Sequence, residues 1–453
     1  MAPSDNKFRV AICGGGIGGL VLAIAIGKYS DTPIDIYEAQ PSIATAGAGF
    51  SLWKRSMEVM KELGLWDDIA KVSTKPPDKP HGPIFRVSDD PNGGYEWFKY
   101  TMSYGPSSMH RWDMMDLLQR HLPSTCTVHL SKRLRTFNAT TPGDIRLHFE
   151  DGSVASTDVL FGADGIRSST RRAMYEAAAR QRHPLVDAVN VGEYADARWS
   201  GYRIYRYLVP SETLLEKYPG HPAARDFQML CGQGKHVVSY PVNNGANINV
   251  ASFVYDPDSI DKPFEGRWVE IALKQELLDS FENFEPEVRQ VLELCESPNR
   301  WALHVVKDLP TVAFGNVAII GDAAHGMAPH TGAGAGQAIE DAYILGRLLA
   351  HKQVTLERVP IALKVYDEVR RISAQKIGQY SSDNGFLYEF IHPSQLGRPR
   401  TTEMMQEWKE IIVELWERSI QSGALKTWYE AEMKLQELLA LDRDMQGNVL
   451  PRL

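Results

Sequence analysis

Short apolar runs followed at once by glycine recur three times along this chain. They are Phe8 to Cys13, Val159 to Phe161 and Val317 to Ile320. Runs of this length bounded by glycine are typical of buried strands. Each run leads through small residues toward a segment that favours a helix. An acidic residue follows the second and third runs (Asp164 and Asp322), and the strand after the first run ends at Glu38. The pattern therefore predicts three strand–glycine–acid junctions and an α/β fold.

The first junction contains the glycines of a dinucleotide-binding turn. Gly14, Gly16 and Gly19 fit the spacing G-x-G-x-x-G between the first strand and a helix expected from Leu20 to Tyr29. Small residues there let backbone N–H groups approach a pyrophosphate. A second strand ends at Glu38, whose carboxylate is suited to accept hydrogen bonds from an adenosine ribose. These features predict a bound dinucleotide.

The second junction reads G-A-D-G-I-R-S-S-T-R from Gly162 to Arg171. It places Asp164 just after a buried strand and just before a helix start. Ser168 or Ser169 is suited to cap that helix.

The third junction joins Gly321 and Asp322 to a glycine-rich approach to a helix expected from Gln337 to Leu349. A helix N-terminus presents unpaired N–H groups and the positive end of a dipole. An anionic or carbonyl-bearing group is therefore expected there, within reach of Asp322. An ordinary glycine-rich loop with a solvated aspartate is the alternative.

Two smaller features point to the same site. Gly49 belongs to a small-residue turn, G-A-G, suited to close packing against a ligand. Arg111 precedes a helical run from Met114 to His121, where it could contact a phosphate or a ribose. A surface arginine that caps its own loop is the alternative for Arg111.

The middle of the chain is β-rich and aromatic. Strands are expected from Tyr202 to Val209, Val237 to Val242 and Ile248 to Tyr255, followed by helices from Trp268 to Phe281 and Pro286 to Cys295. Residues 73–94 are rich in proline and glycine and are expected to form loops. The chain from about residue 356 onward is helical and charged.

Composition narrows the function classes. The chain has 453 residues, a net charge of −8 and four cysteines without C-x-x-C spacing. This balance argues against nucleic acid as a partner, and the cysteines favour a reducing cytoplasm without a zinc site. No uninterrupted apolar run reaches about 18 residues, so no stable membrane insertion is expected.

Together the three junctions resemble the signature set of the single-component, FAD-dependent aromatic hydroxylases, over about residues 8 to 380. The resemblance implies a Rossmann-type α/β FAD-binding domain, an inserted β-rich substrate domain and a helical C-terminal region, as in p-hydroxybenzoate hydroxylase. It divides the chain into FAD-binding segments 1–75, 105–180 and 296–350, substrate-domain segments 76–104 and 181–295, and a helical region 351–453.

The same resemblance implies roles for the junction residues. Gly14, Gly16, Gly19 and Glu38 would bind the FAD adenosine. Asp164 belongs to a motif that the family uses around FAD and the nicotinamide cofactor. Asp322 would contact the ribityl chain, and Ala335 lies in the helix start that would face the flavin. Among these motifs one departure stands out, because Lys54-Arg55 replaces a Pro-Asn pair that the family often carries.

The segments Y-R-Y-L-V-P from Tyr205 and S-Y-P-V from Ser239 resemble the salicylate hydroxylase-like branch, and Y-D-E-V-R-R from Tyr366 resembles fungal members. That branch holds decarboxylating salicylate hydroxylases. It also holds fungal hydroxylases that dearomatise resorcinol-type polyketide aldehydes on tropolone, azaphilone and sorbicillinoid pathways. The dearomatising reaction is the expected function here, with salicylate hydroxylation as the alternative.

The chemistry implied by the resemblance uses bound FAD, a transient NADPH or NADH, and O₂. Reduced flavin reacts with O₂ to give a flavin hydroperoxide, which passes an oxygen atom to an electron-rich phenolic ring. Arg206 is expected to hold the phenolate and Tyr240 to orient the substrate. Arg206 could instead pair with a structural carboxylate, and Tyr240 could fill the sheet's core. His325 and His330 are either proton shuttles or loop-packing residues.

Three other classes of flavoprotein are the competing interpretations. The W-x-W-x-I-P motif of flavin-dependent halogenases is absent. A flavin reductase or oxidase would consume the nicotinamide cofactor without hydroxylating a phenol. A flavin-loaded regulatory protein would be expected to lose polar residues such as Arg206 and Tyr240. A phenolic small molecule is thus the expected partner, with a homodimer left open.

Overall fold

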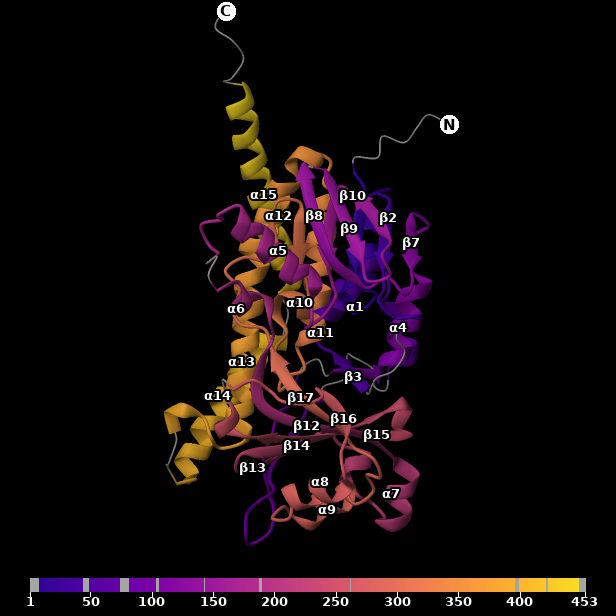
Figure 1. The fold of residues 1–453 in the computed structure, drawn as a ribbon. Coiled ribbons are helices and arrows are strands. Elements are labelled where there is room, and N and C mark those ends of the chain that lie inside the picture. Colours follow the sequence, from indigo (N-terminus) through magenta and orange to yellow (C-terminus); the bar gives the residue numbers. More distant parts are fainter. Residues whose placement is uncertain are drawn as a thin grey trace, which may run out of the picture.

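The computed structural model describes residues 8–43, 49–73, 81–102, 106–141, 143–186, 190–260, 262–395, 399–420 and 423–447. Two sheets lie one above the other, and a column of helices from the last quarter of the chain runs beside both (Figure 1). Positions 47 and 48 of the expected small-residue turn lie outside the described residues.

The upper sheet has six strands in the order β18-β19-β11-β1-β2-β7. Their bounds are Ala313–Phe314, Val317–Ile319, Val159–Gly162, Val10–Cys13, Ile34–Tyr37 and Cys126–His129. All neighbours pair in parallel except β18 with β19. The three apolar runs predicted from sequence are therefore adjacent central strands. Because parallel strands end at the same edge of a sheet, the three glycine–acid junctions meet there.

Helices cover this sheet. The closest pair is α1 (Ile17–Tyr29) and α11 (Gly334–Ala350), which pack against each other along their length. The other helices of this half are α2 (Lys54–Leu63), α3 (Trp66–Val72), α4 (Arg111–Arg120), α5 (Ser169–Arg180), α6 (Val191–Ala195), α10 (Asp322–His325) and α12 (Val359–Tyr366). Of two smaller sheets, one pairs β3 (Gly49–Leu52) with β6 (Ser107–His110). In the other, β9 (Asp144–Phe149) lies between β8 (Leu134–Thr141) and β10 (Val154–Thr157) and pairs with both.

The lower sheet has eight strands in the order β16-β17-β12-β15-β14-β13-β4-β5. Their bounds are Val269–Ile271, Asn299–Val305, Arg198–Pro210, Asn247–Tyr255, Lys235–Val242, Gln228–Gly232, Ile84–Val87 and Tyr95–Lys99. Helices α7 (Ser211–Lys217), α8 (Lys274–Ser280) and α9 (Pro286–Leu292) cover its lower face in Figure 1. The face with Tyr202, Ile204 and Phe253 turns toward the upper sheet.

Two predictions in this region are wrong. The segment expected to be helical from Trp268 begins with edge strand β16, whose Val269 and Ile271 alternate with Glu270 and pair with β17. Within the expected loop region 73–94, residues Ile84–Val87 form β4, which pairs in parallel with β13. Both are short strands that distant segments stabilise.

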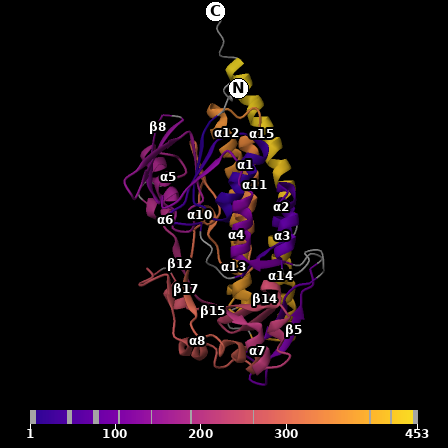
Figure 2. The same cartoon turned by 90° about the vertical axis from the view of Figure 1, so that its right-hand side faces the viewer.

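The C-terminal helices connect the two halves (Figure 2). Helix α13 (Ile372–Tyr388) leads down to the lower sheet, where α14 (Thr402–Ile420) buries Trp408 and Trp416 against Phe85 and Phe98. Helix α15 (Ala424–Gly447) returns upward and packs on α2, α11 and α12. Trp408, Trp416 and Trp428 of these helices are thus buried packing residues.

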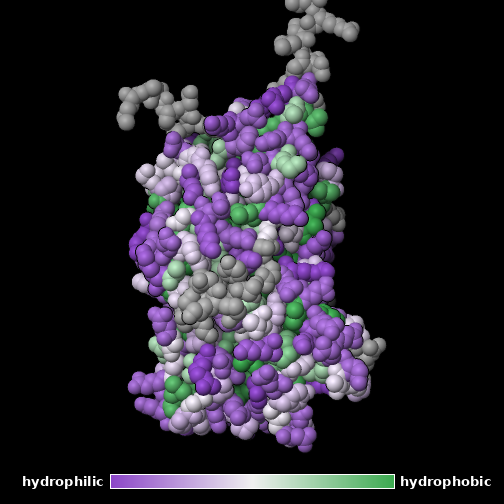
Figure 3. All heavy atoms as spheres, turned by 180° about the vertical axis from the view of Figure 1, so that it is seen from behind, coloured by the Kyte–Doolittle hydropathy of each residue, from purple (hydrophilic) through white to green (hydrophobic). Residues whose placement is uncertain are grey.

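The outer surface seen from behind is mainly hydrophilic, with hydrophobic side chains scattered among polar ones (Figure 3). No helix in the described part of the chain is long and apolar enough to cross a membrane.

Candidate active site

The glycine turn after β1 requires its first and last glycine for different contacts. Gly14 has φ +113°, and a Cβ there would lie 2.2 Å from the carbonyl oxygen of Ala163. A Cβ at Gly19 would lie 2.0 Å from the oxygen of Gly14. Around Gly16, in contrast, nothing lies within 4 Å of the Cβ position. Open space at the N-terminus of α1 suits a pyrophosphate, whose charge the free N–H groups would stabilise.

Glu38 lies at the end of β2, beside this turn. Its two carboxylate oxygens accept hydrogen bonds from the backbone N–H groups of Gly15, at 2.7 Å, and Gln40, at 2.8 Å. These bonds fix the carboxylate next to the open space at Gly16. A ribose hydroxyl there would find an acceptor already in position.

Asp164 is held by the start of α5. Its carboxylate accepts the Ser168 hydroxyl at 2.5 Å, and the N–H and hydroxyl of Thr170 at 2.9 and 3.0 Å. Ser168 in turn accepts the N–H of Arg171 and caps the helix. In this structure Asp164 therefore organises the turn that lies against Gly14.

Asp322 begins α10, directly after Gly321, which has φ +59°. The Asp322 side chain is exposed, and its Oδ1 lies 4.0 Å from the Cβ position of Gly334, the first residue of α11. Ala335 follows in the first turn of that helix and is half-buried. The Asp322 carboxylate and the free N–H groups of α11 therefore border the same space.

Arg111 brings charge from α4 to this space. Burial lowers the pKa of its guanidinium, the charge of Asp322 raises it, and the charge of Arg206 lowers it. Arg111 is thus close enough to interact electrostatically with one residue of the upper half and one of the lower sheet.

Arg206 and Tyr240 lie on the same face of the lower sheet. Arg206 of β12 and Tyr240 of β14 pair with Ala251 and Asn249, two positions apart on the intervening strand β15. The Tyr240 hydroxyl donates to the carbonyl of Gly49 at 3.3 Å. Burial raises the pKa of Tyr240, although the charge of Arg206 and a hydrogen bond with Ser51 oppose the rise. A neutral phenol and a cation therefore stand together where β3 reaches the sheet.

Gly49 has a packing reason to be glycine. A Cβ at this position would lie 2.5 Å from Cγ1 of Val242. Close approach of β3 to β14 is what brings the Gly49 carbonyl to Tyr240. The structure thus brings Gly49, Arg111, Arg206, Tyr240 and Asp322 to the junction between the two halves.

Sequence reasoning missed a buried polar cluster on the same face of the lower sheet. Glu389 accepts the Tyr202 hydroxyl at 2.9 Å, and its other oxygen lies 2.7 Å from Nδ1 of His236. Glu389 and His236 have fully buried side chains. The available signal was a single carboxylate within the apolar run F-L-Y-E-F-I from Phe386.

His330 packs into this cluster. Its ring centroid lies 4.8 Å from Tyr202, 5.3 Å from His236 and 5.2 Å from Phe253. Burial lowers the pKa of His330 to about 3. Its imidazole is therefore neutral at physiological pH and packs against these three rings.

The site residues fit FAD on the geometry alone. The open space at Gly16 suits a pyrophosphate, and the fixed acceptor at Glu38 suits a ribose. The cation at Arg111 suits further negative charge, and the N-terminus of α11 suits the polar edge of a ring.

Comparisons with known proteins agree with this fit. The family described as "FAD binding domain" matches residues 7–254 and 274–381. A salicylate hydroxylase of Pseudomonas putida is 34% identical over 397 residues, covering 86% of this chain and 88% of the relative. The 6-methylsalicylate 1-monooxygenase of Aspergillus terreus is 32% identical over 410 residues, covering 85% and 84%.

A solved structure described as a salicylate hydroxylase substrate complex superposes with a TM-score of 0.77 at 31% identity, covering 96% of this chain and 98% of the other. This match extends through both sheets and the C-terminal helices. It confirms the expected α/β fold with a helical C-terminal region, and the family match confirms FAD as the cofactor. The chain therefore belongs to the FAD-dependent aromatic monooxygenases of salicylate hydroxylase type.

Proposed function

We propose that this enzyme uses NADPH or NADH and O₂ to hydroxylate an electron-rich phenolic ring, and that it dearomatises a resorcinol-type polyketide aldehyde in secondary metabolism. The observation that carries the proposal is the position of Arg206 and Tyr240 on one sheet face, where Tyr240 reaches Gly49 and Arg206 lies within electrostatic range of Arg111. A phenolate attacks an electrophilic oxygen far better than a phenol does, so a site for this chemistry needs a cation at the ring oxygen.

In this proposal each residue has one task. Arg206 holds the substrate's ring oxygen as a phenolate through a charge-assisted hydrogen bond. Tyr240, kept neutral by burial, turns its single O–H from the Gly49 carbonyl to the substrate and so fixes the ring's orientation. The lower sheet excludes water from the ring.

The cofactor side is assigned in the same way. Gly14, Gly16 and Gly19 admit the pyrophosphate, Glu38 binds the ribose, and Arg111 and Asp322 border the ribityl chain. Ala335 places the N-terminus of α11 at the flavin, and Asp164 supports the turn next to Gly14. FAD, when bound, supplies the redox and oxygen-transfer chemistry.

A decarboxylating salicylate hydroxylase is the second candidate. The 34% identity to the Pseudomonas putida enzyme favours it. Arg206 and Arg111 would then share a substrate that carries both a phenol and a carboxylate. The segment from Tyr366, which resembles fungal members of the branch, favours the first candidate.

The test uses purified, FAD-loaded protein with salicylate and an alkylated 2,4-dihydroxybenzaldehyde. NADH and NADPH oxidation is followed for each, and products are identified by mass. A gain of one oxygen with the aldehyde retained supports the dearomatising reaction. Loss of carbon dioxide from salicylate with one oxygen gained supports the second candidate. Peroxide as the sole product with every phenol would contradict both.

A further inference from the structure

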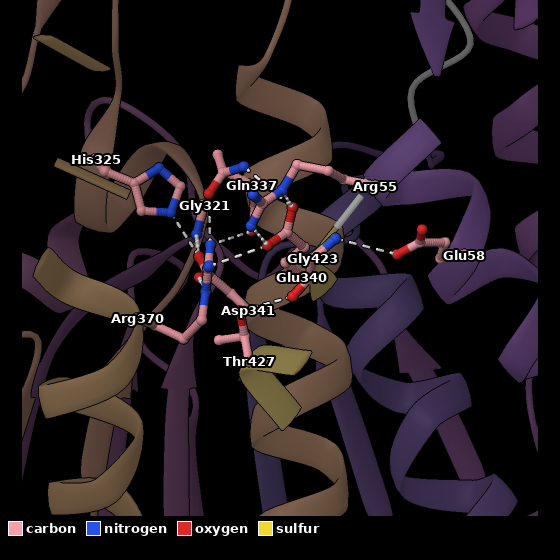
Figure 4. A network of polar contacts seen from close by, with 10 residues as sticks. All are labelled: Arg55, Glu58, Gly321, His325, Gln337, Glu340, Asp341, Arg370, Gly423 and Thr427. Carbon is pink, nitrogen blue, oxygen red and sulfur yellow. Dashed lines mark hydrogen bonds and ion pairs between the residues drawn. The ribbon is translucent and has the colours of Figure 1, made fainter. Parts of the chain in front are cut away.

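A buried ion network joins side chains in the N-terminal half of α11 to neighbouring elements (Figure 4). The Arg55 guanidinium holds both oxygens of Glu340 at 2.8 Å. Arg370 donates to Glu340 at 3.1 Å, to Asp341 at 2.8 Å and to the side chain of Gln337 at 2.6 Å. Two arginines thus balance two adjacent carboxylates whose side chains are fully buried.

One end of the network holds the turn before Asp322. Asp341 accepts the backbone N–H of Gly321 at 3.0 Å, and the same oxygen lies 2.5 Å from Nε2 of His325. Burial raises the pKa of Asp341, but the charges of His325 and Arg370 outweigh this and lower it to about 2. The ionised carboxylate therefore binds Gly321, just before α10, and His325, the last residue of α10. It holds both ends of the short helix that begins with Asp322.

The other end lies near Gly423, which directly precedes α15. The Cβ position of Gly423 lies 3.4 Å from Nη1 of Arg55, and the Gly423 N–H donates to Glu58 of α2 at 3.3 Å. Thr427 in α15 donates back to the Gly423 carbonyl at 2.9 Å. In the sequence Gly423 lies between α14, packed on the lower sheet, and α15, packed on the upper half.

The members of this network depend on one another for charge balance. A buried ion pair gains little net stability over an apolar pair, but removal of one partner leaves an uncompensated buried charge. Without Arg55, Arg370 would be the one arginine of the network facing both carboxylates, so one buried negative charge would lose its arginine partner and Arg370 would be drawn toward Glu340. A change at Arg55 would therefore reach Gly321 through Glu340, Arg370 and Asp341.

We propose that Arg55, Glu340, Arg370 and Asp341 are positioning residues for FAD, through which the C-terminal helices fix the Gly321–Asp322 turn and the N-terminus of α11. This gives the C-terminal region a role in cofactor geometry. It also explains the Lys54-Arg55 pair that departs from the family pattern, because Arg55 supplies the second cation of the network. The proposal does not depend on the identity of the phenolic substrate.

The test compares three variants as apoproteins titrated with FAD. Arg55→Leu removes the cation, and Arg55→Lys keeps the charge but loses the two-pronged contact. Arg358→Leu is the matched control, because Arg358 pairs with Asp442 of α15 at 3.0 Å and is also mostly buried, but it lies outside the network. FAD affinity, the unfolding midpoint with and without FAD, and the visible spectrum of bound flavin are measured.

Arg55→Leu should weaken FAD binding by about tenfold or more, which corresponds to about 1.4 kcal/mol. Its bound-flavin spectrum should shift, and FAD should raise its unfolding midpoint less than in the native protein. The FAD affinity of Arg55→Lys should lie between those of Arg55→Leu and the native protein. If Arg55→Leu does not fold, the comparison of Arg55→Lys with the native protein is the test. Arg358→Leu should lower the midpoint with and without FAD but keep native FAD affinity and spectrum. Native FAD affinity in the Arg55 variants, or an equal loss in Arg358→Leu, would overturn the proposal.

Discussion

Glu389 and His236 form a fully buried acid–imidazole pair, with Oε1 of the glutamate 2.7 Å from Nδ1 of the histidine. Burial raises the pKa of Glu389 well above its usual value and lowers the pKa of His236 well below its usual value. The groups near the pair include the Tyr202 hydroxyl and the rings of His330, Tyr388 and Phe253, and Tyr255 and Cys231 interact with Glu389 electrostatically. None of these groups supplies a positive charge, so burial favours a neutral acid and a neutral imidazole over an ion pair.

This pair predicts a pH dependence of stability. In the unfolded chain Glu389 loses its proton near its ordinary pKa of 4.5, whereas the folded protein retains it to much higher pH. The free energy of unfolding should therefore fall as pH rises above that value, with a contribution from this group of up to about 1.4 kcal/mol per pH unit. Glu389→Gln should remove this contribution, because its amide can donate to His236 and accept from Tyr202. Urea unfolding at about pH 6 and about pH 8 measures the slope.

Glu285→Gln serves as the control for that experiment. Glu285 is also buried, but it pairs with Arg86 at 2.6 Å. Its variant should lose stability at both pH values and keep the native slope. An unchanged slope in Glu389→Gln would contradict a protonated Glu389.

Two glycines of the turn after β1 should have different roles, Gly16 in FAD binding and Gly19 in stability. Gly16→Ala should leave the unfolding midpoint of the apoprotein near the native value, because its Cβ meets no atom within 4 Å, but it should weaken FAD binding. Gly19→Ala should lower the midpoint of the apoprotein itself, since its Cβ would lie 2.0 Å from the Gly14 oxygen. Thermal unfolding of both apoproteins, followed by FAD titration, checks this pair. Equal FAD affinity in Gly16→Ala and native protein would show that the open space is not the pyrophosphate site.

Arg206 and Tyr240 should affect turnover without affecting the cofactor. Arg206→Ala and Tyr240→Phe should keep bound FAD and lose product formation by about 100-fold, the effect expected when a donor to developing charge is removed. Product is quantified by mass after turnover with the phenol that the native enzyme accepts. Arg203→Ala is the control on the same strand, because Arg203 points to the other face and pairs loosely with Asp256 at 3.4 Å. Near-native product formation by both variants would contradict the proposed roles of Arg206 and Tyr240.

Trp416 should carry much of the contact between the C-terminal helices and the lower sheet. It is fully buried and touches Trp53, Phe85 and Tyr100 edge-on. Trp416→Ala should lower the free energy of unfolding by about 3–5 kcal/mol, as expected for a large side chain removed from a core. Tyr429→Ala, at a position 62% exposed on α15, should change it little. Urea unfolding of the two variants gives the comparison.

The sequence by itself determined the three strand–glycine–acid junctions, the α/β class and the family. These features are local, because a buried strand, a tight turn and a helix start each depend on residues close together in the chain. Such local patterns are sufficient to find Gly14, Glu38, Asp164 and Asp322. The helix expected at Trp268 and the loops expected at 73–94 failed for the complementary reason. Strands β16 and β4 are too short to show a period and exist through pairing with β17 and β13.

Only the tertiary structure decided which side chains meet. Arg111, Arg206, Tyr240 and Asp322 come from four separate elements, and their convergence depends on how the two sheets are stacked. The protonated state of Glu389 likewise follows from removal of water around it by β12, β14 and α13, which no local pattern encodes. Desolvation and long-range pairing are properties of the packed molecule, whereas the junction motifs are properties of the chain.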